Sequence, residues 1–174
     1  DFDVFVGAYD GSTLFFQNTG TANSPAFAAA IANPFGLSNV VSNYPTSSSA
    51  FADIDDDGDL DVFITNNVGE TYFFQNTGTA NNPAFAAATT NPFGLANLNS
   101  LLDLDGDGDL DALGGSTGFL RNVGAATTPT FAAESLPSSF GLNDLSANAH
   151  TTFIDIEGDG DLDVFVSNHA GNPI

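Results

Sequence analysis

The sequence repeats itself about every 50 residues, and this repeat constrains the fold more than any other feature. Residues 13–30 and 71–88 match almost residue for residue, and residues 117–133 are a weaker third copy. Proteins with a period of this length are built by stacking copies of one small unit, each of which buries its apolar faces against its neighbours. The chain of 174 residues is therefore expected to be a stack of such units.

Each repeat contains four segments with the composition of short β-strands. In the second repeat these segments are 48–54, 60–65, 71–76 and 83–89, separated by an acidic loop, a turn at Gly69 and an Asn/Gly/Pro cluster. Short runs of aromatic and β-branched residues between such turns indicate antiparallel sheet, and helical periodicity is absent from the sequence. We therefore predict an all-β fold of β-propeller-type blades, each with four antiparallel strands.

The whole chain, 1–174, is predicted to be one repeat array with approximate blades 1–48, 49–98, 99–148 and 149–174. The first blade lacks its first strand and the last is partial, so the array holds three full repeats plus partial ends. Closed propellers need about four to eight blades, which predicts an excerpt of a larger propeller or an open array. Unpaired strand edges favour self-association, with a filament as the extreme case.

Acidic residues are concentrated in short segments instead of being spread along the chain. The formal net charge is −21, there is no Lys, and Arg121 is the single Arg. Nucleic acids and anionic membranes are bound by clustered Lys and Arg, so we expect neither partner, and no apolar run is long enough for membrane insertion. Of the 22 Asp and Glu residues, 18 lie at 1–3, 53–61, 103–111 and 155–163.

Three of the acidic loops share a spacing that suits a divalent cation. Each has acidic residues at positions 1, 3, 5, 7 and 9 and Gly at position 6, where the chain turns sharply. Carboxylates at 1, 3 and 5 can point inward, position 7 can offer its backbone carbonyl, and position 9 adds a carboxylate. Such hard oxygen donors suit Ca²⁺ better than Mg²⁺ or Zn²⁺. The predicted ligands of about three Ca²⁺ ions are Asp53, Asp55, Asp57, Asp59, Asp61, Asp103, Asp105, Asp107, Asp109, Asp111, Asp155, Glu157, Asp159, Asp161 and Asp163.

Two other interpretations of these loops are weaker. An EF-hand loop requires Glu at position 12, where this chain has Ile64, Gly114 and Val166, and its flanks are helices, whereas strands are predicted here. A solvated acidic turn without a metal is the second alternative, and three copies with the same Gly placement argue against it. Asp56, at position 4, is predicted to face solvent and to be replaceable, because Gly takes that position in the other two loops.

The acidic loops lie between two predicted strands and follow a Phe-Gly pair, a combination that resembles the FG-GAP/VCBS repeats of integrin α-subunit propellers and many bacterial surface proteins. Residues 93–115 fit best, because Phe-Gly stands about ten residues before Asp103. The resemblance implies a calcium-binding β-propeller, usually seven-bladed, with each Ca²⁺ in the hairpin between the first two strands of a blade. Glu157 is longer than the usual Asp, which implies a looser site, and the first loop keeps only Asp1 and Asp3.

The sequence contains no recognisable catalytic constellation, so we expect a module that is not an enzyme. His150 and His169 are isolated, there is no Cys, and the acidic pairs belong to the predicted metal loops. We expect a calcium-stabilised structural or adhesion module, secreted or on a cell surface, that contacts a protein or a glycan. Two alternatives stay open: a carbohydrate-binding propeller with exposed aromatic side chains, and a non-catalytic domain of a secreted enzyme.

Overall fold

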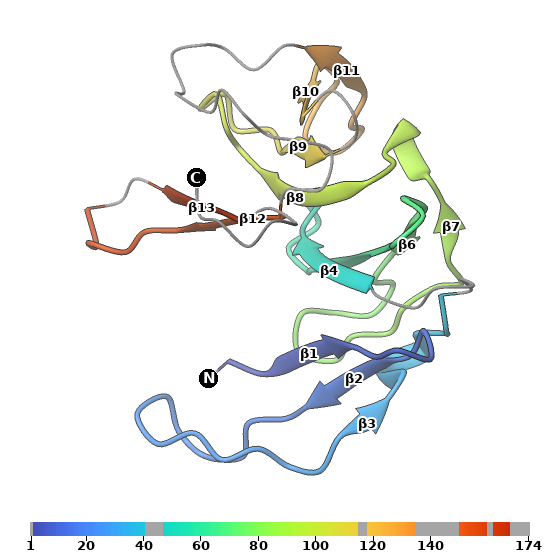
Figure 1. Ribbon diagram of the computed structural model, residues 1–174, viewed down its shortest axis with the longest axis vertical. Helices are drawn as coiled ribbons and strands as arrows, with labels where there is room; N and C mark the ends of the chain where they lie inside the picture. The colour runs from blue at the N-terminus through green and yellow to red at the C-terminus, as the bar shows by residue number, and fades with distance from the viewer. Residues whose placement is uncertain (1, 41–46, 115–117, 135–149, 160–161, 168–174) are drawn as a thin grey trace.

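In the computed structural model, the described residues form four antiparallel sheets, and Figure 1 shows how these are arranged. The structure describes residues 2–40, 47–114, 118–134, 150–159 and 162–167. Within them each strand pairs with the strand next to it in sequence, and two short 3-10 turns are the only helical elements. No helix in these residues is long and apolar enough to cross a membrane. The meander of short strands is the arrangement of a propeller blade, and it confirms the predicted all-β fold class.

The second and third sheets contain four strands each, and the first contains three. Their sequences favour strands because aromatic and β-branched residues fit the pleated surface, and Gly69 turns the chain between two of them at φ +86°. The elements are β1 (Val4–Gly7), β2 (Thr13–Phe16), β3 (Ile31–Ala32), η1 (Pro34–Gly36), β4 (Ser47–Ala52), β5 (Asp61–Asn66), β6 (Thr71–Phe74), β7 (Thr89–Thr90), η2 (Pro92–Gly94), β8 (Leu98–Leu102), β9 (Asp111–Gly114), β10 (Gly118–Asn122), β11 (Phe131–Glu134), β12 (His150–Ile154) and β13 (Asp163–Ser167).

Successive sheets pack against one another in an open series. Strand β4 lies between β1 and β8, and β8 in turn contacts β12 (Figure 1). Separate apolar clusters fill the interface between the first and second sheets, between the second and third, and between the third and fourth. In the described part of the chain this series does not close into a barrel, which agrees with an open array or a partial propeller. The blade boundaries near residues 48, 98 and 148 stay predictions.

Strand β5 is buried on both faces, which explains why its sequence is apolar without alternation. Val62 and Ile64 pack into the cluster shared with the first sheet, whereas Phe63 packs into the cluster shared with the third sheet. All three side chains are at most 1% exposed. Because successive side chains of a strand point to opposite faces, one strand contributes to two cores. The second sheet is thus stabilised by both of its neighbours.

The fourth strand of the second sheet differs from its prediction. The sequence predicts a strand over 83–89, but β7 begins only at Thr89, and Phe85 makes a single bridge to Asn76. Phe73 lies three residues before Asn76 and pairs with Thr89. Thr89 lies four residues after Phe85, so the fourth strand carries one extra residue, which interrupts the ladder. Ala86 donates its backbone N–H to the carbonyl of Gln75 at 2.8 Å, but the Ala residues have low strand propensity and form no continuous ladder.

Phe side chains fill the interfaces between sheets, as the sequence predicts. Phe63 is buried, and Phe51, Phe73 and Phe85 are partly buried and pack against the clusters on either side of the second sheet. The ring centroids of Phe63 and Phe73 are 4.8 Å apart. This separation is typical of favourable aromatic pairs, which add to the free energy gained from apolar burial.

Candidate metal centres

The three acidic loops are the hairpin connections between the first two strands of their sheets. The 53–61 loop joins β4 to β5, the 103–111 loop joins β8 to β9, and the 155–163 loop joins β12 to β13. Ala52 pairs with Asp61 at the base of the first hairpin, so position 9 of the loop is the first residue of the second strand. The predicted location between the first two strands is confirmed for each loop.

The side chain at position 1 curls each loop around itself. Asp53 accepts hydrogen bonds from the backbone N–H of Asp57 at 3.0 Å and of Gly58 at 2.9 Å. Asp103 does the same in its loop, where it accepts from the N–H of Gly108 at 3.0 Å. Gly58 and Gly108 have φ of +92° and +93°, a conformation that L side chains rarely adopt. The Gly at position 6 is therefore required by the turn, as predicted.

The acidic side chains at positions 1, 3 and 5 converge in the 53–61 loop and in the 103–111 loop. In the 53–61 loop, the carboxylate oxygens of Asp53, Asp55 and Asp57 lie within 4.8 Å of one another. The equivalent side chains of the 103–111 loop converge within the same distance. Like charges at this separation repel one another, and the repulsion is strongest where water is scarce. A cation between the carboxylates would turn this repulsion into attraction.

Three buried carboxylate oxygens in the 53–61 loop have no hydrogen-bond partner. They are Oδ1 of Asp55, Oδ1 of Asp59 and Oδ2 of Asp61. Asp59 is 8% exposed and Asp61 is 1% exposed, so water does not satisfy these atoms freely. A buried acceptor without a partner costs about 1–3 kcal/mol, and more when it is charged. The donor set therefore fits a hard divalent cation such as Ca²⁺, which needs several oxygen ligands.

Burial also makes the ionised form of this loop unfavourable without a cation. Burial raises the pKa of Asp61 from 3.8 to about 6, although the backbone N–H of Asn76 donates to this carboxylate. Burial and the charges of Asp57 and Asp55 raise the pKa of Asp59. A positive ion held among these side chains would act in the opposite direction and favour their charged forms.

The carboxylate at position 9 ties the loop to the third strand of its sheet. Asp61 Oδ1 accepts from the backbone N–H of Asn76 at 2.6 Å, and Asp111 Oδ1 accepts from that of Asn122 at 2.8 Å. The side chains of these Asn residues in turn accept from backbone N–H groups of the following turn. Our sequence interpretation missed the Asn residues, although they stand at the same place in each repeat.

A second side chain, which stands at or just after the end of the third strand, reaches the loop. Gln75 Nε2 donates to Asp55 Oδ2 at 2.8 Å. Arg121 holds the same repeat position in the third sheet, and its guanidinium contacts Asp105. Our sequence interpretation missed both residues. The available signal was their position directly before the repeated Asn at the end of the third strand.

The loop of the fourth sheet is described only in part. Asp155 Oδ1 accepts hydrogen bonds from two backbone N–H groups, at 2.6 and 3.1 Å, as position 1 does in the other loops. A hydrogen bond with Asp163 and the charge of that residue raise the pKa of Glu157, so these two carboxyl groups lie close together. Asp161 and Asp1 lie outside the described residues.

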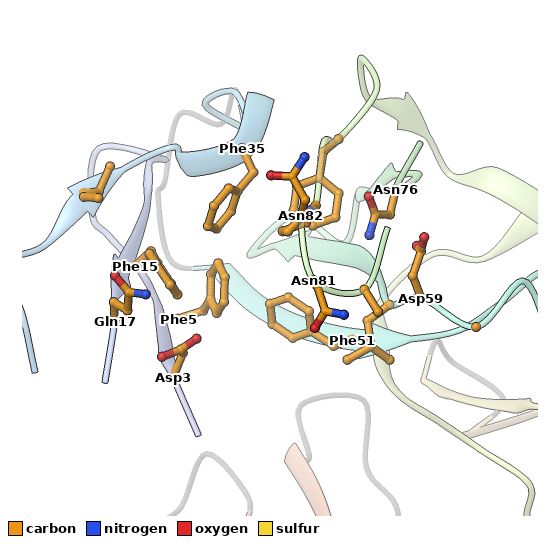
Figure 2. A pocket seen from close by; sticks show the side chains of 16 residues that line it. Asp3, Phe5, Phe15, Gln17, Phe35, Phe51, Asp59, Asn76, Asn81 and Asn82 are labelled. Carbon is orange, nitrogen blue, oxygen red and sulfur yellow. The ribbon is translucent and has the colours of Figure 1, made fainter. Parts of the chain in front are cut away.

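A groove of about 670 Å³ lies between the first and second sheets (Figure 2). Phe5, Phe15 and Phe35 line one side, and Asn81 and Asn82 project toward it from the turn after β6. The equivalent space between the second and third sheets is filled by apolar side chains that bury Phe63, the counterpart of Phe5. The groove thus offers both aromatic faces and amide groups.

Comparison with known protein families identifies part of this arrangement. Residues 53–114 match the family model described as FG-GAP-like repeat. The match begins at the first residue of one acidic loop and ends with the last residue of β9, so it includes both loops whose carboxylates converge. No curated protein and no solved structure matches the chain. The resemblance that the sequence motifs indicate is confirmed for residues 53–114.

Proposed function

Residues 53–114 form an FG-GAP-like repeat, and from this premise we propose that the chain is a calcium-stabilised structural module that works outside the cell. It would contact a protein, a glycan or another copy of itself at a cell surface. Extracellular Ca²⁺ is millimolar, so even weak sites would be filled there. At the far lower free Ca²⁺ of a cytosol, the acidic loops would repel themselves and destabilise their hairpins.

The unpartnered oxygens of Asp55, Asp59 and Asp61 carry this proposal. They belong to the hairpin that joins β4 to β5, and Asp61 also accepts from the third strand. A Ca²⁺ ion held by them would connect three strands of one sheet. Asp53 and Asp57 complete the proposed ligand set, and the equivalent residues of the other two loops form the further proposed sites.

We also propose that the chain has no catalytic role of its own. Its clustered carboxylates lie in loops whose geometry suits a cation. Of the two His residues, His150 stands at the start of β12 and His169 lies outside the described residues. The module would present a rigid surface for contacts with its partners, and bound Ca²⁺ would stabilise the fold of that surface.

Isothermal titration calorimetry on chelator-treated protein tests the proposal. We expect Ca²⁺ to bind and Asp55→Asn to lower the affinity of one site strongly, because a proposed ligand loses its charge. The matched control is Asp56→Asn, which removes a charge from the same loop at an exposed position. The proposed site would be contradicted if the wild-type protein bound no Ca²⁺, or if Asp55→Asn bound it as tightly as the wild type.

The groove between the first and second sheets favours glycan binding as a second candidate function. Phe35 is 39% exposed, and Asn81 and Asn82 add amide groups, a combination that suits the apolar faces and hydroxyl groups of a sugar ring (Figure 2). A glycan array followed by Asn82→Ala would test it. Binding that this variant does not weaken would exclude the groove as the sugar site.

A further inference from the structure

The two loops whose carboxylates converge differ in the side chain that reaches them from the third strand. In the second sheet Gln75 donates to Asp55, at position 3 of its loop, over 2.8 Å. In the third sheet Arg121 Nη2 lies 2.6 Å from Asp105 Oδ2, also at position 3, and 3.4 Å from Asp107 Oδ2. The sequences FFQN and FLRN place the two residues at the same point of the repeat.

This exchange changes the charge of the site, whereas the three carboxylates converge within 4.8 Å in both loops. A Gln amide donates without adding charge, whereas a guanidinium brings a full positive charge to two of the three converging carboxylates. Arg121 is the only Lys or Arg in the sequence, so this charge has no second source in the chain.

The converging carboxylates of the two loops are neutralised to different extents. In the 53–61 loop, the side chain that reaches position 3 is the neutral amide of Gln75. In the 103–111 loop, the guanidinium of Arg121 contacts Asp105 and Asp107. The carboxylates at position 9 do not add to this difference, because Asp61 and Asp111 each accept from the backbone N–H of the repeated Asn. The ion pairs of Arg121 therefore leave the 103–111 loop with less need of an external cation.

We infer that Arg121 is a built-in cation that lowers the affinity of the 103–111 loop for Ca²⁺, so that the two loops fill at different Ca²⁺ concentrations. Ca²⁺ and the guanidinium use the same carboxylates of Asp105 and Asp107, and their positive charges repel each other. The metal must therefore displace the guanidinium and forfeit its ion pairs. The 53–61 loop has no such competitor, since Gln75 is neutral. This inference rests on the proposed calcium binding.

Exchanging the two side chains tests the inference. Arg121→Gln gives the third sheet the side chain of the second, and we expect the weaker Ca²⁺ site to bind about tenfold more tightly in calorimetry. Gln75→Arg is the reciprocal change, and we expect the tighter site to weaken by a similar factor. Gln17→Arg is the matched control, because it adds the same charge at the same repeat position in the first sheet, away from the 53–61 and 103–111 loops.

Thermal unfolding in chelator and in Ca²⁺ separates competition from a merely structural role. With chelator present, Arg121→Gln should lower the melting temperature, because the ion pairs are lost. In saturating Ca²⁺ the same variant should melt at or above the wild-type temperature, because the site is relieved of a competing charge. A purely structural Arg121 would lower the melting temperature equally in both conditions, and that result would overturn the inference.

The outcomes also separate this inference from the proposed function. If the wild-type protein binds Ca²⁺ but neither Arg121→Gln nor Gln75→Arg alters its affinities, the role of Arg121 is refuted and calcium binding stands. Wild type that binds no Ca²⁺ would refute both. A change in Gln17→Arg as large as that in Gln75→Arg would also refute the role of Arg121, since it would reflect net charge alone.

Discussion

At the scale of single residues, position 4 of the acidic loops carries a conformational conflict. Asp56 has φ +56°, whereas the other two loops place Gly106 and Gly158 there with φ of +78° and +76°. A left-handed conformation costs an L residue about 1–2 kcal/mol, although Asp tolerates it better than most. Asp56 is exposed, as predicted, and the three converging carboxylates of its loop are those of Asp53, Asp55 and Asp57.

Replacing Asp56 with Gly should therefore stabilise the protein. We expect a gain of about 0.5–1 kcal/mol in the free energy of unfolding, because the strained φ is relieved and one repelling charge is removed. Urea unfolding in chelator and in Ca²⁺ would measure it. Asp56→Asn is the control, since it removes the charge and keeps the side chain. Equal gains from the two variants would show that the backbone contributes nothing.

Asp61 makes the chelated protein sensitive to pH. Burial raises its folded-state pKa to about 6, above the 3.8 of an unperturbed carboxyl. The folded state then binds the proton more tightly than the unfolded state, so this stabilisation is complete below about pH 4 and is lost as pH rises through about 6. We expect the melting temperature in chelator to decrease as the pH is raised from about 4 to about 6.

The matched variant for this pH effect is Asp61→Asn, which keeps an oxygen to accept from the Asn76 N–H and has no charge to titrate. It should flatten the pH dependence in chelator and raise the stability there at neutral pH. In Ca²⁺ it should lower the stability, because a proposed ligand is weakened. A pH profile in chelator identical to that of wild type would show that Asp61 is not the group responsible.

At the scale of structural elements, a buried Asn organises the end of the third strand. Asn76 is 3% exposed, and its Oδ1 accepts from the N–H groups of Gly78 and Ala84, both at 3.0 Å. Asn18 makes the same bonds in the first sheet but is only partly buried. The Asn thus fixes the turn that leads to the fourth strand.

Asn76→Ala should lower the free energy of unfolding by about 2–4 kcal/mol, because two backbone donors lose their acceptor in a buried turn. Asn18→Ala should cost about 1 kcal/mol, since water can replace the lost bonds there. Urea unfolding of the two variants in Ca²⁺ measures the difference. Equal losses would show that burial does not set the cost.

The elements that the sequence predicts well are those defined by short-range patterns. The apolar run of β5, the Gly at 58 and the Gly-containing turn at 69 locate two strands and their hairpins. The fourth strand is predicted poorly, because its interruption depends on a register with β6 that Phe85 and Thr89 do not reveal in sequence. Pairing between strands sets this register, and composition does not.

The candidate site likewise has a part that the sequence predicts and a part that it does not. The convergence of Asp53, Asp55 and Asp57 follows from alternate spacing in a loop turned by Gly, so the sequence predicts it. The contacts of Gln75 and Arg121 come from a strand that lies 14 or more residues away, and they depend on how that strand folds back. Because the two residues differ in charge, this unpredicted part is what distinguishes one loop from the other.

At the scale of the whole molecule, the sheets depend on one another. Each interface holds its own apolar cluster, and β5 contributes to two of them. In such arrays stability is approximately a sum of the stability of each unit and of its interfaces with its neighbours. Calcium that stabilises the hairpin of one sheet would therefore stabilise the sheets packed on both sides of it.

The most direct test of this account is thermal unfolding with Ca²⁺, with Mg²⁺ and with chelator. A site filled to a hundred times its Kd adds about 2.7 kcal/mol, which in a chain of this size raises the melting temperature by about 5–10 °C. We predict a rise of at least this size in millimolar Ca²⁺, a much smaller one in Mg²⁺, and complete reversal by chelator. A melting temperature that is the same in Ca²⁺ and in chelator would contradict the account.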